Sequence, residues 1–419
     1  MKNLFEKIIL LIIAILCGFS FFSALNIDPL VICIAVFILE VAVLYIKGGK
    51  IRINGVFLFW IADIVLMFFY ATKVSNSIYY YNTFLLLLVF LSVLLVSYVD
   101  SVDIEKIIRV LVIFSIISIG FILIEMVLRE RFLSIVSIFM TSKNAALERH
   151  RIRVGQGYKG LAEHSNVITM ASSILAFYSI YFLGVRKKPM MIALLVLSVF
   201  GILLSNERST LVVIPLAILF TYFVSGKRDK VLRAFKIFVV AVVIIAVIFL
   251  LRSFLSQYTL FSRVFDTINS IFQGEDYSGR DALYESAISS WKRSPIIGNG
   301  WFYFFFNNRG ILGRDTYVHA HNLIYELLCD TGIIGLVLIV TPMVITLVAN
   351  IKALKHSPEG SQSIYKFTLA LQLCIIIDSL MHVTFYSQNM VAFYFIAIMI
   401  FYATRKKSAN SYTRLPSHM

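Results

Sequence analysis

The chain has 419 residues and a formal net charge of +15, and 59% of its residues are hydrophobic. Its mean hydropathy of +0.87 and an apolar content well above the roughly 45–50% of soluble domains exclude a soluble globular protein. The composition instead indicates a polytopic membrane protein. We expect membrane lipids among its partners and no nucleic acid.

Apolar runs close to the roughly 20 residues that a helix needs to cross a bilayer core recur along the chain. About twelve such runs lie near residues 7–25, 29–46, 55–72, 79–99, 107–127, 165–184, 190–205, 209–225, 234–252, 322–350, 365–385 and 388–404. We therefore predict an all-α fold of about twelve transmembrane helices.

Basic residues in the short connections indicate how these helices are oriented. Lys and Arg near helix ends stay on the cytoplasmic side, and here they gather at both termini and in every second connection. Examples are Lys47 with Arg52, Arg186, and the run that begins at Arg405. This pattern places both termini in the cytoplasm and the intervening connections on the outer side.

Two long connections, at about 128–164 and 253–320, fall on the outer side and divide the chain into regions. We predict transmembrane helices 1–9 over residues 1–252, a large outer loop over 253–320, helices 10–12 over 321–404 and a cytoplasmic tail over 405–419. Both outer connections are basic, which long loops tolerate. Their charge fits either attraction to anionic lipid head groups or binding of an anionic, lipid-linked substrate.

Carboxyl groups inside the predicted helices are candidates for function because charged side chains are costly there. They are Glu40, Asp63, Glu125, Glu326 and Asp378. A transporter would gather such groups near the midplane, in helices that recur in two halves of the chain. We find no such repeat, and only Asp63 and Asp378 fall near the centre of their segments. For these two, a structural role with hydrogen bonds from neighbouring helices is the alternative.

Two arginines lie on the outer side where an anionic ligand can approach. Arg208 occupies a very short turn, where it either extends its aliphatic stem along the membrane boundary or contacts a ligand. Arg280 follows a Ser-Gly turn and begins a stretch with helical spacing. A cation at a helix N-terminus opposes the macrodipole, which favours phosphate binding by Arg280 and the amides of that turn. The aromatic run WFYFFF further along fits an interfacial belt or a sugar- or polyprenyl-binding surface.

The stretch HAHNLIYE, at the start of the tenth segment, combines two histidines with a helix-capping residue. Asn322 is a natural N-cap, and Glu326 lies one turn further on. We expect His319 and His321 to lie in extended chain, where residues two apart point the same way. A histidine here can act as a general base, or it can serve only in capping and hydrogen bonding. A zinc site would need further ligands at recognisable spacing, so we predict no metal.

Three segments, SNERSTL, SGRDALYESAISSWKRSPIIGNG and HAHNLIYELLCDTGIIGL, follow one another between residues 203 and 338. Together they resemble the O-antigen ligase and polymerase superfamily of bacterial envelope glycosyltransferases. The most specific part is the pair His321 and Asn322 with the Gly-x-x-Gly that begins at Gly332. The stretch RVGQGYKGLAEHSN is similar to the family's Arg-x-x-Gly and His-x-Asn region, at Arg153 and His164.

The resemblance implies a C-type glycosyltransferase architecture with its active site at the periplasmic face of the bacterial inner membrane. It implies transfer of a glycan from undecaprenyl pyrophosphate to an acceptor hydroxyl, with inversion and without nucleotide sugar, metal or other cofactor. By resemblance, Arg208 and Arg280 stabilise negative charge on the leaving pyrophosphate, and His321 is the base. The implied substrate-binding residues are His319, Asn322, Arg153 and His164.

Ligases and polymerases of this superfamily differ in their acceptor. A ligase uses a hydroxyl of the lipid A core oligosaccharide, whereas an O-antigen or capsular polysaccharide polymerase uses another lipid-linked repeat unit. The chain length, helix count and position of the large loop are more similar to the ligase, which we therefore expect. A polymerase and, from a different class, a polysaccharide transporter or flippase are the alternatives.

Overall fold

The computed structural model describes residues 2–18, 21, 29–47, 55–73, 86–93, 103–140, 142–153, 157–162, 165–205, 207, 209–225, 280–311, 317–382 and 384–412. The predicted ninth membrane segment at 234–252 and the first part of the predicted large loop lie outside the described residues. Arg208 and His164 also lie outside them, and for Arg153 only the backbone is described.

Within the described ranges all regular elements are helices, which confirms the all-α prediction for this part of the chain. The helices up to residue 225 are α1 (Lys2–Cys17), α3 (Pro29–Lys47), α4 (Gly55–Lys73), α6 (Ile104–Val136), α7 (Ser142–Arg153), α8 (Ser165–Phe182), α9 (Lys188–Ser205) and α10 (Thr210–Val224). The later helices are α14 (Arg280–Trp291), α15 (Tyr303–Asn307), α16 (Leu323–His356), α17 (Glu359–Ser379), the short 3-10 helix η1 (Thr384–Tyr386) and α18 (Gln388–Tyr412). Residues 86–93 form a further helical stretch.

Several of these helices have the length and composition to cross a membrane. Among the described helices, 5 qualify: α6, α8, α9, α16 and α17. Shorter apolar helical stretches lie at Leu30–Ile46, Gly55–Tyr70 and Thr210–Val224. All of them coincide with apolar runs of the sequence, so the chain is a polytopic helical membrane protein. The total of about twelve spans stays a prediction.

Two membrane helices extend beyond their apolar runs, and each contains a break. α6 continues to Val136, and Arg129 inside it has a left-handed φ of 25°. α16 continues to His356, and Gly332 inside it has φ 63° and ψ −163°. The break in α16 lies close to the candidate site and helps to form it.

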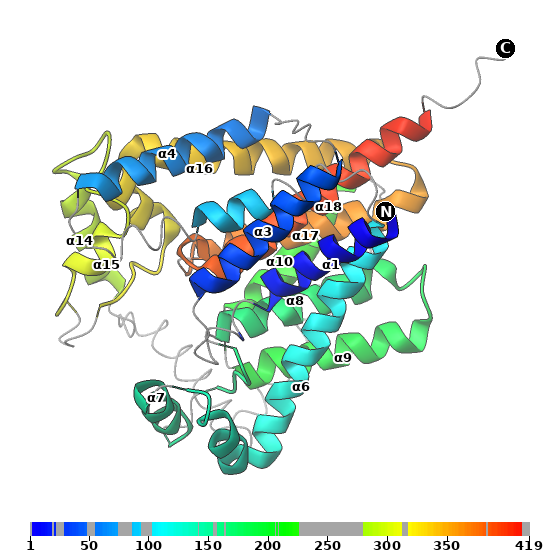
Figure 1. Ribbon diagram of the computed structural model, residues 1–419, viewed down its shortest axis with the longest axis horizontal. Coiled ribbons are helices and arrows are strands. Elements are labelled where there is room, and N and C mark those ends of the chain that lie inside the picture. Colours follow the sequence, from blue (N-terminus) through cyan, green and yellow to red (C-terminus); the bar gives the residue numbers. More distant parts are fainter. Residues whose placement is uncertain are drawn as a thin grey trace.

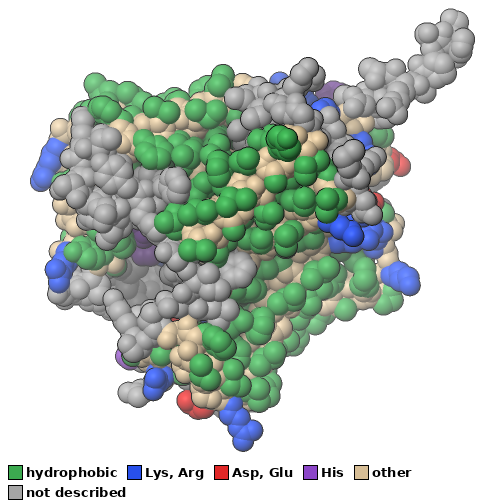
Figure 2. Space-filling view, in the orientation of Figure 1, with side chains coloured by type: hydrophobic (Ala, Val, Ile, Leu, Met, Phe, Trp, Pro, Cys, Tyr) green, Lys and Arg blue, Asp and Glu red, His purple; other side chains and the backbone are tan. Residues whose placement is uncertain are grey.

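α18 lies in the interior of the helix bundle. Every residue from 390 to 401 is buried, and a helix that is apolar all round belongs in a protein interior. α17 packs along α18, α8 packs against α6, α9 and α17, and α4 lies beside α16 (Figure 1). Large apolar side chains are exposed along α3, α6 and α9, and Figure 2 shows hydrophobic side chains over much of this face. An apolar surface of this extent fits contact with lipid.

The helices of the large loop lie at one end of the bundle. Figure 1 places α14 and α15 at that end, and the start of α1 and the end of α18 toward the opposite end. These helix ends are thus separated from α14 and α15 along the helix axes. The membrane side that each end faces stays a prediction.

Candidate active site

The segment that follows α14 is hydrogen-bonded to the break in α16. In a membrane helix, a break leaves backbone groups that need partners from the protein. The segment 295–300 supplies them through Ile333 N–H to Pro295 O (3.0 Å), Ile334 N–H to Ile296 O (3.1 Å), Asn299 N–H to Cys329 O (3.1 Å) and Gly300 N–H to Asp330 O (2.8 Å). The loop therefore completes the hydrogen bonding of α16 and is fixed to it.

Two glycines make this close approach possible. Gly298 has φ 71° and Gly332 has φ 63°, and both values disfavour residues with a side chain. A Cβ atom on Gly298 would lie 2.5 Å from the amide nitrogen of Gly332, and a Cβ atom on Gly332 would lie 2.5 Å from that of Gly298. The first glycine of the Gly-x-x-Gly motif is thus required by backbone packing as well as by conformation.

Three of the six residues in the aromatic run at 301–306 are buried, so its interpretation as an interfacial belt is wrong for these three. Trp301, Phe302 and Phe304 are at most 5% exposed. Trp301 stacks on Tyr386 with 4.3 Å between ring centroids. Asp330 joins the same layer, because it accepts hydrogen bonds from the Phe304 amide (2.8 Å) and the Tyr386 hydroxyl (2.9 Å). These contacts bind the large loop to both α16 and η1.

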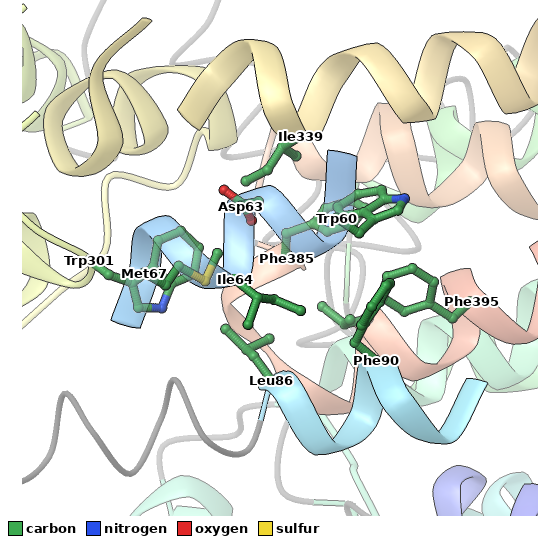
Figure 3. Close-up of a pocket in the computed structure, with 11 residues that line it drawn as sticks. Trp60, Asp63, Ile64, Met67, Leu86, Phe90, Trp301, Ile339, Phe385 and Phe395 are labelled. Carbon is green, nitrogen blue, oxygen red and sulfur yellow. The ribbon is translucent and has the colours of Figure 1, made fainter. Parts of the chain in front are cut away.

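A small apolar cavity lies next to Trp301, and Asp63 of α4 is one of its lining residues (Figure 3). Its volume of about 30 Å³ is enough for one water molecule. Asp63 is 2% exposed, and its Oδ1 accepts no hydrogen bond within the described part of the chain. Asp63 lies midway along its helix, as predicted.

His319 is held in place by Glu326 in the first turns of α16. Its Nδ1 lies 2.5 Å from Glu326 Oε1, and the Ala320 amide donates to Glu326 Oε2 at 2.8 Å. Glu326 is fully buried, and its two carboxylate oxygens contact the His319 ring and the Ala320 amide. Phe305 stacks on the other side of His319, with 4.4 Å between centroids. The result is a fixed imidazole at the helix mouth.

Asn322 is the N-cap of α16, as predicted. Its Oδ1 accepts the amides of Ile324 (2.9 Å) and Tyr325 (3.4 Å), and its Nδ2 donates to the carbonyl oxygen of Leu380 (3.0 Å). The side chain therefore joins the start of α16 to the end of α17. This leaves Asn322 a positioning role next to His321.

His321 departs from the extended chain that the sequence predicted. Its φ is 54°, in the left-handed region, although the residue is not glycine. Burial, followed by the positive charge of Arg280, lowers the pKa of His321 from 6.5 to about 4. His321 is therefore neutral at pH 7, which is the form that can accept a proton.

Arg280 begins α14, as predicted, and lies near the histidines. Its charge acts on Tyr284, His321 and His382. Tyr284 stacks on Tyr325 of α16 with 4.6 Å between centroids, which fixes α14 against α16. The large loop thereby holds a guanidinium whose charge reaches His321.

His382 is a component of the site that sequence reasoning missed. Its Nδ1 lies 3.0 Å from Asp378 Oδ1, and its Nε2 lies 3.8 Å from Glu207 Oε2. Thr384 donates to the other oxygen of Asp378 at 3.0 Å. Burial alone would lower the pKa of His382, but the hydrogen bond and charge of Asp378, together with Glu207, raise it. Protonated His382 is therefore favoured between two carboxylates.

These contacts also change the interpretation of Asp378. The sequence placed it near the centre of a membrane segment, but α17 ends at Ser379, so Asp378 lies at a helix end. The four-residue spacing of Asp378 and His382 is a helix-turn spacing that would have signalled the pair. Glu207 directly precedes Arg208 in the sequence, so the SNERSTL segment contributes a described carboxylate to this cluster.

The first long connection uses part of its positive charge internally. Arg151 pairs with Glu125 and lies 2.7 Å from Glu148, and Lys159 Nζ lies 2.6 Å from Glu148. Glu125 also accepts the amides of Lys159 (3.0 Å) and Gly160 (2.7 Å). The charges of Arg151 and Lys159 are therefore paired within the protein, and this part of the basic connection is not left to lipid or substrate alone. Arg153 ends α7 in the same connection.

The described part of the chain thus brings together four of the candidate residues, namely Arg280, His319, His321 and Asn322, and adds His382, Asp378 and Glu207. Over these residues, no group of three or more His, Cys, Asp or Glu side chains has the arrangement of a metal site. The site offers a guanidinium, a neutral histidine, and histidines paired with carboxylates.

Fold and site define a polytopic all-α membrane protein with a polar, histidine-rich site where a large loop meets the mouth of a membrane helix. Residues 193–340 match the family model described as O-Antigen ligase. This part of the chain, which contains Arg280, His319 and His321, is similar to the O-antigen ligase superfamily. Members are glycosyltransferase-like enzymes of O-antigen processing, and they include ligases and related polymerases. No curated protein matches the chain.

Proposed function

We propose that the protein is an O-antigen ligase of the bacterial inner membrane. It transfers O-antigen polysaccharide from undecaprenyl pyrophosphate to a hydroxyl of the lipid A core oligosaccharide at the periplasmic face. The observation that carries the proposal is that Arg280 at the start of α14 and neutral His321 at the mouth of α16 interact electrostatically, inside the segment that matches the family. A cation and a base in one site suit the departure of an anionic group and the activation of a hydroxyl.

The cation acts on the leaving group. As the bond from the anomeric carbon to the pyrophosphate oxygen breaks, the pyrophosphate takes the electron pair and its negative charge grows. Arg280 stabilises this charge more in the transition state than in the bound donor, which is the condition for catalysis. We assign the same role to Arg208.

His321 acts on the acceptor. It takes the proton of the acceptor hydroxyl while that oxygen forms its bond to the anomeric carbon on the face opposite the pyrophosphate, so the configuration inverts. Such a base contributes roughly 10²–10⁴-fold to a rate. Binding of the anionic donor raises the pKa of His321 from its low value, which strengthens the base when substrate is present.

The remaining candidate residues bind and orient. His319, fixed by Glu326, hydrogen-bonds the donor, and Asn322 sets the position of His321 through its cap. We assign Arg153 and His164 to contacts with the glycan. None of these roles involves a metal or a nucleotide sugar.

The test is glycan transfer by purified His321→Ala and Arg280→Ala, with undecaprenyl-pyrophosphate-linked O-antigen as donor and lipid A core as acceptor. Each variant is expected to fold and to lose at least about a hundredfold in transfer. Lys292→Ala is the matched control, because Lys292 is exposed just beyond α14 and should leave transfer unchanged. Near-normal transfer by His321→Ala would contradict the assignment of the base.

A deletion strain separates the ligase from the alternatives. Long glycan that accumulates on the lipid carrier indicates a lost ligase, whereas single repeat units on the lipid A core indicate a lost polymerase. Loss of activity in Asp63→Asn, with Arg280 dispensable, would instead favour a transporter. Reaction of a cysteine at position 280 with a cytoplasmic reagent would contradict the proposed topology.

A further inference from the structure

A groove lies at the end of α16 remote from His319 and His321. It runs between the C-terminal part of α16 and α18 and has a volume of about 570 Å³. Its lining residues are Val344, Ile345, Val348, Ala349, Lys352, Ala353, His356 and Arg405. The lining is apolar along α16 and basic at the end of that helix.

The apolar part of the groove has the character of an acyl-chain contact. Val344, Ile345 and Val348 are 51%, 40% and 42% exposed. They are spaced so that they lie on one face of α16, and they offer no polar group to a ligand. In a bilayer, this face contacts hydrocarbon rather than water.

The basic part of the groove comes from two helices. Lys352 and His356 lie in the last turns of α16, and Arg405 approaches from α18. The ring of His356 is held in place, because its Nδ1 lies 2.8 Å from the Lys352 carbonyl oxygen and donates to it. The residues that line the groove include no acidic side chain. The three basic groups therefore converge on a position that suits one phosphate.

The distance along α16 places this basic end at a membrane surface. At roughly 1.5 Å per residue, Lys352 lies about 44 Å along the helix from its start at Leu323. The hydrocarbon core is only about 30 Å thick, so the helix mouth and Lys352 belong to opposite surfaces. The basic run at Arg405 lies on the surface that the charge pattern assigns to the cytoplasm.

We propose that this groove binds one anionic phospholipid, with its phosphate at Lys352, His356 and Arg405 and an acyl chain along Val344, Ile345 and Val348. Exposed apolar faces elsewhere contact any lipid. Here the basic cluster selects a net negative head group over a zwitterionic one, whose amine meets three basic side chains. The inference is independent of the glycosyl transfer proposed above, since the groove lies at the opposite end of α16 from His319 and His321.

The experiment is native mass spectrometry of the full-length protein after titration with phosphatidylglycerol or phosphatidylethanolamine. The wild type is expected to retain one phosphatidylglycerol at concentrations where phosphatidylethanolamine is lost. The double variant Lys352→Gln/Arg405→Gln should weaken phosphatidylglycerol binding by about thirtyfold, from about fivefold per basic side chain. Lys352→Arg/Arg405→Lys should retain it.

The matched control is Lys187→Gln/Lys188→Gln, which removes the same charge at the start of α9, outside the groove. Equal loss of phosphatidylglycerol in the control and the groove variant would overturn the proposal, because it would reflect general charge attraction. Equal retention of the two lipids by the wild type would overturn it as well. Glycerol 3-phosphate is the third arm, and competition by it at concentrations similar to the lipid would refute an acyl-chain site.

Discussion

Gly332→Ala is the most direct test of how the site is built. Gly332 lies at φ 63° and ψ −163°, a combination that is essentially restricted to glycine. Alanine in such a conformation costs about 1–3 kcal/mol. Its methyl group would also lie 2.5 Å from the amide nitrogen of Gly298. Because the atoms that this methyl group would meet belong to the backbone, no side chain can turn aside, and the loop has to move away from α16.

Movement of the loop away from α16 breaks backbone hydrogen bonds, and the number broken determines how far the docked loop is destabilised. The four backbone hydrogen bonds between segment 295–300 and α16 have lengths of 2.8–3.1 Å. Each contributes about 1 kcal/mol. Loss of two to four of them, added to the conformational cost, destabilises the docked loop by about 3–7 kcal/mol. The undocked loop takes Arg280 away from His321, and we expect transfer to fall by at least about a hundredfold, which corresponds to about 2.7 kcal/mol.

The assay combines transfer activity with hydrogen exchange over residues 280–311. Gly310→Ala is the control for conformational cost alone, because Gly310 has φ 87° but its Cβ would meet no atom within 4 Å. Gly120→Ala, in α6 with open space around it, is the neutral control. We expect rapid exchange only in Gly332→Ala. Wild-type transfer and exchange in that variant would refute the claim that the break positions the site.

Three further predictions concern charge. Since neutral His321 is the base and its pKa is about 4, kcat/KM should fall only as pH drops through about 4, and Arg280→Gln should move this limb upward; a wild-type limb near 6.5 would contradict the burial argument. The pKa of His382 is raised, so its contribution to stability is complete below its unfolded pKa and is lost as pH rises through the folded value. His382→Gln should therefore lower Tm more at pH 5.5 than at pH 9, and a pH-independent difference would argue against the ion pairs. Arg151→Met leaves buried carboxylates unpaired and should cost about 3–5 kcal/mol in thermal unfolding, whereas exposed Arg149→Met should be near neutral.

Local sequence rules predicted part of this site correctly. Asn322 caps α16 and Arg280 begins α14, as expected from the cap and the turn that precede these helices. Both predictions depend on residues within one helical turn, where backbone geometry is determined by the adjacent sequence. The family motif drew attention to the same positions.

Long-range contacts account for what the sequence did not reveal. His382 is paired with Glu207, a residue 175 positions earlier, and no local pattern indicates that partner. Trp and Tyr favour the membrane interface, which is why the aromatic run fits a belt, but contacts with Tyr386 and Asp330 accompany the burial of Trp301 and Phe304. Arg151 pairs with Glu125 of α6, a partner 26 positions away that no local pattern indicates.

The break at Gly332 has a mechanical consequence. The turns of α16 that precede the break carry Glu326 and begin at the cap residue Asn322, next to His321. Hydrogen bonds and the stacking of Tyr284 on Tyr325 join these turns to the large loop. The same loop also accepts the amides of Ile333 and Ile334 on the membrane side of the break, so it holds both parts of α16. Trp301 of the loop stacks on Tyr386 of η1 as well. A shift of the membrane bundle is therefore transmitted to α14 and to the turns that carry Glu326, and the site moves with the bundle.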